Sequence, residues 1–149
     1  MKKLLILFIV LFLSSCSRGE VEMIDVYFTQ GGTLPNSETY ASKFSNFADY
    51  SYALDNGLES DISEYSDDFD DEFFIEHDLI IVLFYSDSGL DCGDFRLNPV
   101  RIDNNQLNVT ITSLVVYGSL DPQPTISKLY GYLIVIDKTE IVDVELIFD

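Results

Sequence analysis

Leu79-Ile80-Ile81-Val82-Leu83-Phe84-Tyr85 is an apolar run of seven residues without polar alternation. A strand with one face in water alternates polar and apolar residues, whereas a strand covered on both faces does not. The run therefore predicts a central strand with other elements packed on both of its faces. Residues 129–136 form a second apolar run and predict another strand.

Shorter segments around these runs alternate polar and apolar residues, which is typical of strands with one face in water. They are residues 21–28, 107–111 and 142–148. The segment 95–102 changes its apolar face at Asn98-Pro99, which predicts a bulge at a sheet edge. Asn104-Asn105 then predicts a hairpin turn, and short turns join antiparallel strands.

One long helix is expected between Ser42 and Gly57. Ser42 is a suitable N-cap, an apolar stripe follows at helical spacing, and Gly57 with its preceding asparagine is a stop signal. A short helical turn, capped by Asp67 or Asp68, is expected to end at Glu76. Together these elements predict an α+β domain: a curved, mostly antiparallel sheet of about six strands with one helix packed on a face.

The N-terminal residues have the form of an export signal. Lys2 and Lys3 precede an apolar run from Leu4 to Leu13, and Cys16 follows two serines. The run is half of the roughly 20 apolar residues that a transmembrane helix needs. Leu13-Ser14-Ser15-Cys16 resembles a bacterial lipobox, which implies cleavage before Cys16 and a diacylglycerol on its sulfur.

Such cleavage divides the chain into a lipoprotein signal peptide over residues 1–15, a short tether over residues 16–20 and a single α+β domain over residues 21–149. Two or three acyl chains, palmitate among them, hold a protein stably at a membrane without a spanning helix. We therefore expect a lipid-anchored protein of the bacterial cell envelope, outside the cytoplasm.

The chain is strongly acidic, with 26 acidic and 8 basic residues and a net charge of −18. Removing residues 1–15 takes away two lysines and no acid, so the net charge becomes −20. A field of this sign repels phosphate backbones, which argues against nucleic acid as a partner. The acidity itself is typical of a soluble, exposed surface.

Cys92 is the one thiol left if Cys16 is acylated, so the mature chain then has no pair for an internal disulfide. We interpret it as a small packed residue in a turn rather than a nucleophile.

His77 is the one histidine and has a carboxylate on either side, which could orient it as a base. No nucleophile motif accompanies it, so a surface histidine between two elements is the simpler interpretation. One histidine and one thiol also fall short of a structural zinc site.

Calcium is the metal that the sequence favours, because it binds several oxygen ligands at short range. The candidate ligands are Asp67, Asp68, Asp70 and Asp71. They do not match the spacing of a calcium-binding loop, so a solvated acidic surface is the alternative. Paired carboxylates could also serve a small hydrolase.

A long loop before the strand at 129–136 is the candidate partner-binding segment. It carries Tyr117, Leu120, Pro122 and Pro124. Loops of this length in a small domain tend to be functional, and a proline-stiffened loop loses little entropy on binding. The alternative is a loop that folds back over an open end of the sheet.

Four motifs in the C-terminal half carry a family resemblance. They are Asp71-Glu72-Phe73-Phe74, Leu79-Ile80-Ile81-Val82, Leu107-Asn108-Val109-Thr110-Ile111 and Tyr132-Leu133-Ile134-Val135-Ile136-Asp137-Lys138. On these motifs residues 70–149 resemble the PrcB-like C-terminal domain family of bacterial envelope lipoproteins. Asp137 departs from the family pattern, which has proline there. The resemblance implies an envelope domain that takes part in a protein assembly, and it carries over no catalytic residue.

Two function classes follow from the sequence. The first is an envelope-anchored lipoprotein that acts as a non-enzymatic protein-binding or assembly subunit and needs no cofactor. The second is a small metal-dependent or carboxylate-based hydrolase at the cell surface. The weak case for a catalytic histidine favours the first, whereas convergent carboxylates with raised pKa in a deep pocket would favour the second.

Overall fold

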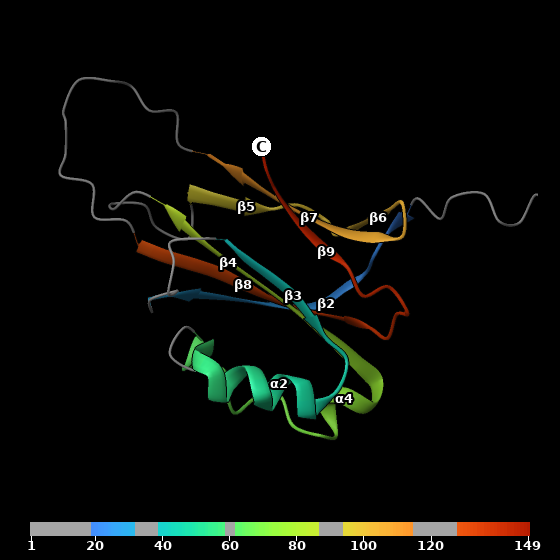
Figure 1. Cartoon of the computed structure of the whole chain (residues 1–149). Coiled ribbons are helices and arrows are strands. Elements are labelled where there is room, and N and C mark those ends of the chain that lie inside the picture. Colours follow the sequence, from blue (N-terminus) through green and yellow to red (C-terminus); the bar gives the residue numbers. More distant parts are fainter. Residues whose placement is uncertain (1–18, 32–38, 59–61, 87–93, 115–127) are drawn as a thin grey trace, which may run out of the picture.

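The computed structural model describes residues 19–31, 39–58, 62–86, 94–114 and 128–149 (Figure 1). In these ranges the strands are β1 (Gly19–Glu20), β2 (Met23–Gln30), β3 (Tyr40–Phe44), β4 (His77–Ser86), β5 (Phe95–Leu97), β6 (Arg101–Asp103), β7 (Gln106–Ser113), β8 (Lys128–Asp137) and β9 (Val144–Phe148). The helices are α2 (Phe47–Ala53) and α4 (Phe73–Glu76), and a wide helical turn, η1 (Leu54–Leu58), continues α2. The chain is an α+β protein, as its sequence predicts.

The strands form two sheets and not the one sheet that we expected. One sheet has the antiparallel order β2-β8-β4-β3. In the other, β7 pairs antiparallel with β5 and β6 and parallel with β9, and β1 extends β6. The four-stranded sheet lies between the five-stranded sheet and the helices, so the molecule has three layers (Figure 1).

The central strands β4 and β8 explain the layering. Residues Leu79 to Leu83 of β4 are each 0% exposed, which confirms the predicted burial of this run on both faces. Residues Ile80 and Val82 point into the core between the sheets, whereas Leu79 and Ile81 point into the core beneath the helices. An apolar strand of this kind needs a covering layer on each side. The helices supply one layer and the second sheet supplies the other.

The predicted bulge and hairpin are both present in the five-stranded sheet. Strands β5 and β6 pair with the same neighbour, β7, and are separated by Asn98-Pro99-Val100. Asn104 and Asn105 turn the chain from β6 to β7 with φ of 51° and 64°. Asparagine tolerates this left-handed backbone region, which the hairpin turn requires.

The predicted long helix is shorter than expected and begins later. Ser42, expected as its N-cap, lies in β3, where it pairs with Ile81. The cap is Asn46, whose Oδ1 accepts a hydrogen bond from the Asp49 N–H at 2.9 Å. Gly57 ends the helical segment with φ of 112°, as its stop signal predicts. Pairing with the buried residues of β4 therefore outweighs the helical preference of the residues before Asn46.

The second helix, α4, also differs from the prediction. Asp67 and Asp68 lie in turns before it and do not cap it. Asp70 takes this role in part, since its Oδ1 accepts a hydrogen bond from the Phe73 N–H at 2.9 Å. Phe74 of α4 packs with Tyr50 of α2, which is 0% exposed, in the core beneath the four-stranded sheet.

Gly19 and Glu20, which the sequence assigned to a tether, form β1 and pair with Ile102 and Arg101 of β6. Val21 then donates its N–H to the carbonyl oxygen of Val100 at 2.8 Å, before the chain enters β2 of the other sheet. Within the ranges that the structure describes, no helix is both long and apolar enough to cross a bilayer.

Candidate binding surface

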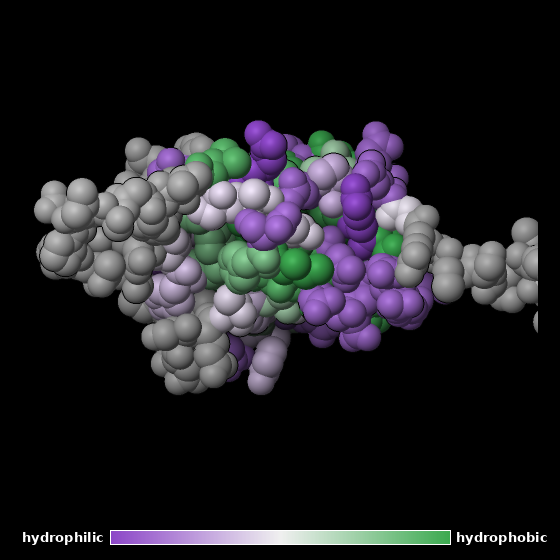
Figure 2. Space-filling view, turned by 90° about the horizontal axis from the view of Figure 1, so that it is seen from above, coloured by the Kyte–Doolittle hydropathy of each residue, from purple (hydrophilic) through white to green (hydrophobic). Residues whose placement is uncertain are grey.

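The outer face of the five-stranded sheet is the surface that neither the other sheet nor the helices cover. Along β7, Leu107, Val109 and Ile111 are buried between the sheets, and the residues between them point outward. The outward residues are Asn108, Thr110 and Thr112, each partly exposed. Figure 2 shows this face with polar, pale and apolar side chains side by side. A one-sided sheet of this kind offers a broad surface for a partner.

A groove lies on this outer face, near the N-terminal end of the folded residues. Its volume is about 600 Å³, and its lining residues are Gly19, Glu20, Arg101, Ile102, Asp103, Asn108, Thr110 and Ile147. Arg101 donates a hydrogen bond to Glu20 Oε1 at 3.1 Å, with both side chains largely exposed. Asn108, which lies opposite Arg101 in the sheet, has a buried Oδ1 without a hydrogen-bond partner. The groove therefore combines both charge signs with unused hydrogen-bonding capacity.

A smaller hollow of about 350 Å³ lies between the ends of the sheets, and its lining residues are Phe84, Tyr85, Ser86, Phe95, Ile111, Ser113, Phe148 and Asp149. Phe148 is 54% exposed and meets the ring of Phe84 edge to face, with 5.5 Å between the ring centroids. Ser113, at the end of β7, is one of these lining residues. The candidate residues of the predicted docking loop, Tyr117, Leu120, Pro122 and Pro124, lie outside the described residues, as do Cys16 and Cys92.

The outer edge of β2 is occupied by side chains of the same chain. Asp25 Oδ1 accepts a hydrogen bond from the Val26 N–H at 2.8 Å, and the Tyr65 hydroxyl donates to the Phe28 carbonyl oxygen at 3.2 Å. Edge strands that expose apolar residues, as β2 does with Ile24 and Val26, are prone to unwanted strand pairing. Asp25 and Tyr65 reduce this risk, so we do not place the binding surface on β2.

His77 lies at the start of β4 and is not oriented by its neighbours in the sequence. Its Nδ1 is 3.9 Å from Asp137 Oδ1, too far for a hydrogen bond, and is buried without another partner. The imidazole packs against Phe73, with 5.5 Å between the ring centroids. Asp78 cannot orient it, because the Asp78 carboxylate binds two lysines. This geometry favours a packed histidine over a catalytic base.

The calcium candidates Asp67, Asp68, Asp70 and Asp71 are all exposed. One of them, Asp70, uses a carboxylate oxygen for the helix-start contact with Phe73. In the part of the chain that the structure describes, no three or more histidine, cysteine or acidic side chains are grouped so that they could hold a metal ion. Calcium binding at these residues stays a prediction.

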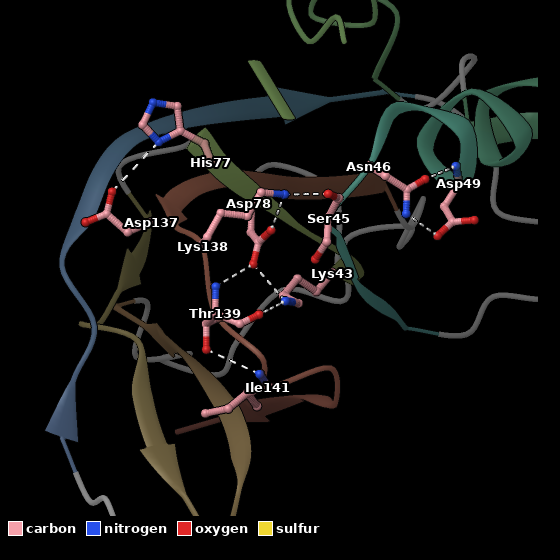
Figure 3. A network of polar contacts seen from close by, with 10 residues as sticks. All are labelled: Lys43, Ser45, Asn46, Asp49, His77, Asp78, Asp137, Lys138, Thr139 and Ile141. Carbon is pink, nitrogen blue, oxygen red and sulfur yellow. Dashed lines mark hydrogen bonds and ion pairs between the residues drawn. The ribbon is translucent and has the colours of Figure 1, made fainter. Parts of the chain in front are cut away.

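A buried ionic network, which the sequence did not reveal, joins β3 and β4 to the turn after β8 (Figure 3). Asp78 is 0% exposed and receives hydrogen bonds from Lys43 Nζ at 2.7 Å, Lys138 Nζ at 3.0 Å and the Thr139 N–H at 2.9 Å. Lys43 Nζ also donates to the Thr139 carbonyl oxygen at 2.7 Å, and Lys138 Nζ donates to the Ser45 carbonyl oxygen.

The network keeps Asp78 ionised. Burial alone would raise the pKa of its carboxyl, but the hydrogen bonds from Lys43, Thr139 and Lys138 outweigh burial and hold the pKa below its ordinary value. A catalytic acid needs the opposite shift, and Asp78 lines neither of the two hollows. The network therefore has a structural role, because it holds the turn between β8 and β9 against the four-stranded sheet.

Comparisons of the chain with protein-family models, with curated proteins and with solved structures found no match. The resemblance of residues 70–149 to the PrcB-like C-terminal domain family stays a prediction.

Proposed function

We propose that this protein is an envelope-anchored lipoprotein that acts as a non-enzymatic protein-binding or assembly subunit. The observation that carries the proposal is the outer face of the five-stranded sheet, which no other element of the described residues covers. The four-stranded sheet has covering layers on both faces, whereas the five-stranded sheet has one on its inner face, and a hollow lined by both aromatic and polar residues opens beside Phe148 at its end. Protein interfaces commonly use such mixed surfaces, while small-molecule sites are more enclosed and apolar.

The position of β1 determines how close to the membrane an anchored domain would lie. Gly19 is the third residue after Cys16, and it already pairs with Ile102 in the sheet. If Cys16 carries lipid, the domain is held next to the membrane, where only partners in the envelope are within reach. The acidity of the domain would keep it soluble in the aqueous space beside the membrane.

Labelling with an alkyne fatty acid tests the anchor. The wild-type protein should incorporate the label and have the mass of a chain cleaved before Cys16 with acyl groups added. Cys16→Ser should carry no label and accumulate as the uncleaved precursor. A labelled Cys16→Ser variant that partitions with membranes like the wild type would show that the lipobox interpretation is wrong.

Recovery of a partner from the native envelope tests the binding function. The candidate docking segment is the loop with Tyr117 and Leu120, which follows β7 in the sequence. The double variant Tyr117→Ala, Leu120→Ala should recover less partner than the wild type with an unchanged thermal melt. A lower melting temperature with full recovery would instead make this loop a structural cover of the sheet end.

A further inference from the structure

We propose that the groove on the outer face of the five-stranded sheet docks onto zwitterionic phospholipid head groups of the membrane that holds Cys16. This inference rests on the lipid anchor proposed above. It assigns a membrane contact to the groove at the β1 end, and it leaves the hollow near Phe148 for the protein partner.

Tether length places the groove at the bilayer surface. An extended chain advances at most about 3.6 Å per residue, so the three steps from Cys16 to Gly19 span no more than about 11 Å. The polar layer on each side of a bilayer is about 5–8 Å thick. Gly19 and Glu20 are themselves lining residues of the groove, and their strand pairs with β6, which supplies Arg101 and Asp103. The groove therefore cannot move far from the head groups while Cys16 is anchored.

The charges in the groove match a head group that bears a phosphate and an ammonium. The Arg101 guanidinium is suited to a phosphate, because it donates several hydrogen bonds in a fixed plane. Glu20 and Asp103 provide carboxylates for an ammonium. The ion pair of Arg101 with Glu20 is largely exposed and thus weak, so both partners can exchange it for head-group contacts.

Asn108 adds neutral hydrogen-bonding capacity beside these charges. Its Oδ1 is buried and has no partner, although it lies opposite Arg101 in the wall of the groove. A rotation of the amide would turn this oxygen toward an ammonium in the groove. Buried polar atoms usually have partners, and an ammonium in the groove would supply a donor for this oxygen.

The arginines of β5 and β6 lie on the same face as the groove. The mature chain has a net charge of −20, which repels phosphate from most of the surface. Lys43 and Lys138 are bound to Asp78, whereas Arg96 and Arg101 lie opposite Thr112 and Asn108 of β7. Cross-strand partners share a face, so both arginines belong to the outer face of the sheet. Glu145 lies opposite Asn108 on the same face, so this face presents both charge signs to a zwitterionic head-group layer.

Docking would also turn the partner hollow away from the bilayer. The β1 and β6 strands lie at one end of the five-stranded sheet, and the start of β5 lies at the other (Figure 1). Phe95, which begins β5, lines the hollow together with Phe148. A domain held at the groove end thus presents this hollow to other proteins of the envelope.

Paramagnetic relaxation of backbone amides tests the proposal. The acylated, ¹⁵N-labelled protein is reconstituted in phosphatidylethanolamine vesicles that contain a trace of lipid with a gadolinium chelate on its head group. The amides of Gly19, Arg101 and Asn104 should relax several-fold faster than those of Phe95 and Phe148. Vesicles of phosphatidylglycerol, which has no ammonium, should reduce this difference.

Paired variants separate docking from simple tethering. In the variant Arg101→Gln, Asp103→Asn, the amides at the two ends of the sheet should relax at similar rates. The matched control Lys128→Gln, Asp71→Asn makes the same charge changes outside the groove. It should retain the faster relaxation at the groove end of the sheet. Equal relaxation at both ends in the wild type, or an unchanged difference in the groove variant, would overturn the proposal. The mass of the reconstituted protein shows its acylation beforehand, so failure of docking is distinguished from failure of the anchor.

Discussion

Removal of the Asp78 carboxylate should be among the most damaging single changes in this chain. The variant Asp78→Ala leaves Lys43 with a buried positive charge, because its side chain is 2% exposed and its other contact is the Thr139 carbonyl oxygen. Lys138 suffers less, since its side chain is 37% exposed and can turn toward water. The loss of stability in Asp78→Ala therefore arises mainly from the broken ion pair of Asp78 with Lys43.

The burial of the two lysines determines how much unfolding free energy Asp78→Ala should lose. Removing one partner of a buried ion pair costs about 3–5 kcal/mol, and the contact with the half-exposed Lys138 adds at most about 1 kcal/mol. Domains of this size are stable by about 5–15 kcal/mol, so Asp78→Ala should remove a large part of the total. Asp78→Leu with Lys43→Met removes both charges. It should be more stable than Asp78→Ala by at least about 1 kcal/mol, because no uncompensated charge remains buried.

Urea unfolding followed by circular dichroism measures both effects. A free energy of unfolding for Asp78→Ala within about 1 kcal/mol of the wild type would refute the reasoning, because the loss of one buried partner costs several times more. A double variant that is less stable than Asp78→Ala would likewise refute the assignment of the cost to Lys43.

The same pair predicts how stability depends on pH. The pKa of Asp78 is lower in the folded protein than in the unfolded chain, so the unfolded state binds its proton at higher pH. Its contribution to stability is complete above the unfolded pKa, near 4, and is lost as the pH falls through the folded pKa. The double variant Asp78→Leu, Lys43→Met should therefore lose less stability than the wild type below pH about 4. Equal acid sensitivity of the two proteins would contradict this account.

Four further substitutions, with Ser42→Ala as a control, test the packing and the cap of α2 by thermal melts. Val82→Asp places a carboxylate between the two sheets and Ile81→Asp places one beneath the helices, so each should unfold the domain at a cost of several kcal/mol; near-native melts would contradict the burial of β4 on both faces. Gly131→Ala should cost about 1–3 kcal/mol, because its Cβ would lie 2.8 Å from the Val82 carbonyl oxygen, and an unchanged melt would show that β8 can shift. Asn46→Ala should cost about 1 kcal/mol through loss of the cap on α2, whereas Ser42→Ala should cost less; the reverse order would restore the cap to Ser42.

Local patterns in the sequence predicted the parts of the fold that depend on neighbouring residues. The unbroken run at Leu79 to Tyr85 indicated a strand covered on both faces, and Asn104-Asn105 indicated a hairpin. The nature of each covering layer was not predictable in the same way, because an apolar face is equally well buried by a helix or by a sheet. The single sheet that we expected is therefore two.

Features assembled from distant residues were not visible in the sequence. Asp78 is 35 residues from Lys43 and 60 from Lys138, and an acid beside an apolar run carries no signal of such partners. The groove draws its lining residues from β1, β6, β7 and β9. Its ion pair joins Glu20 to Arg101, 81 residues apart, so no local motif could have indicated it.

Cross-linking of the acylated protein in its native envelope tests the proposed function most directly. A carbodiimide couples the carboxylates of this acidic domain to lysines that lie in direct contact with them, and mass spectrometry then identifies the linked peptides. One envelope protein should link reproducibly to the wild type and much less to the Tyr117→Ala, Leu120→Ala variant. No linked protein above the level found with an unrelated acylated acidic domain would contradict the role of a protein-binding subunit.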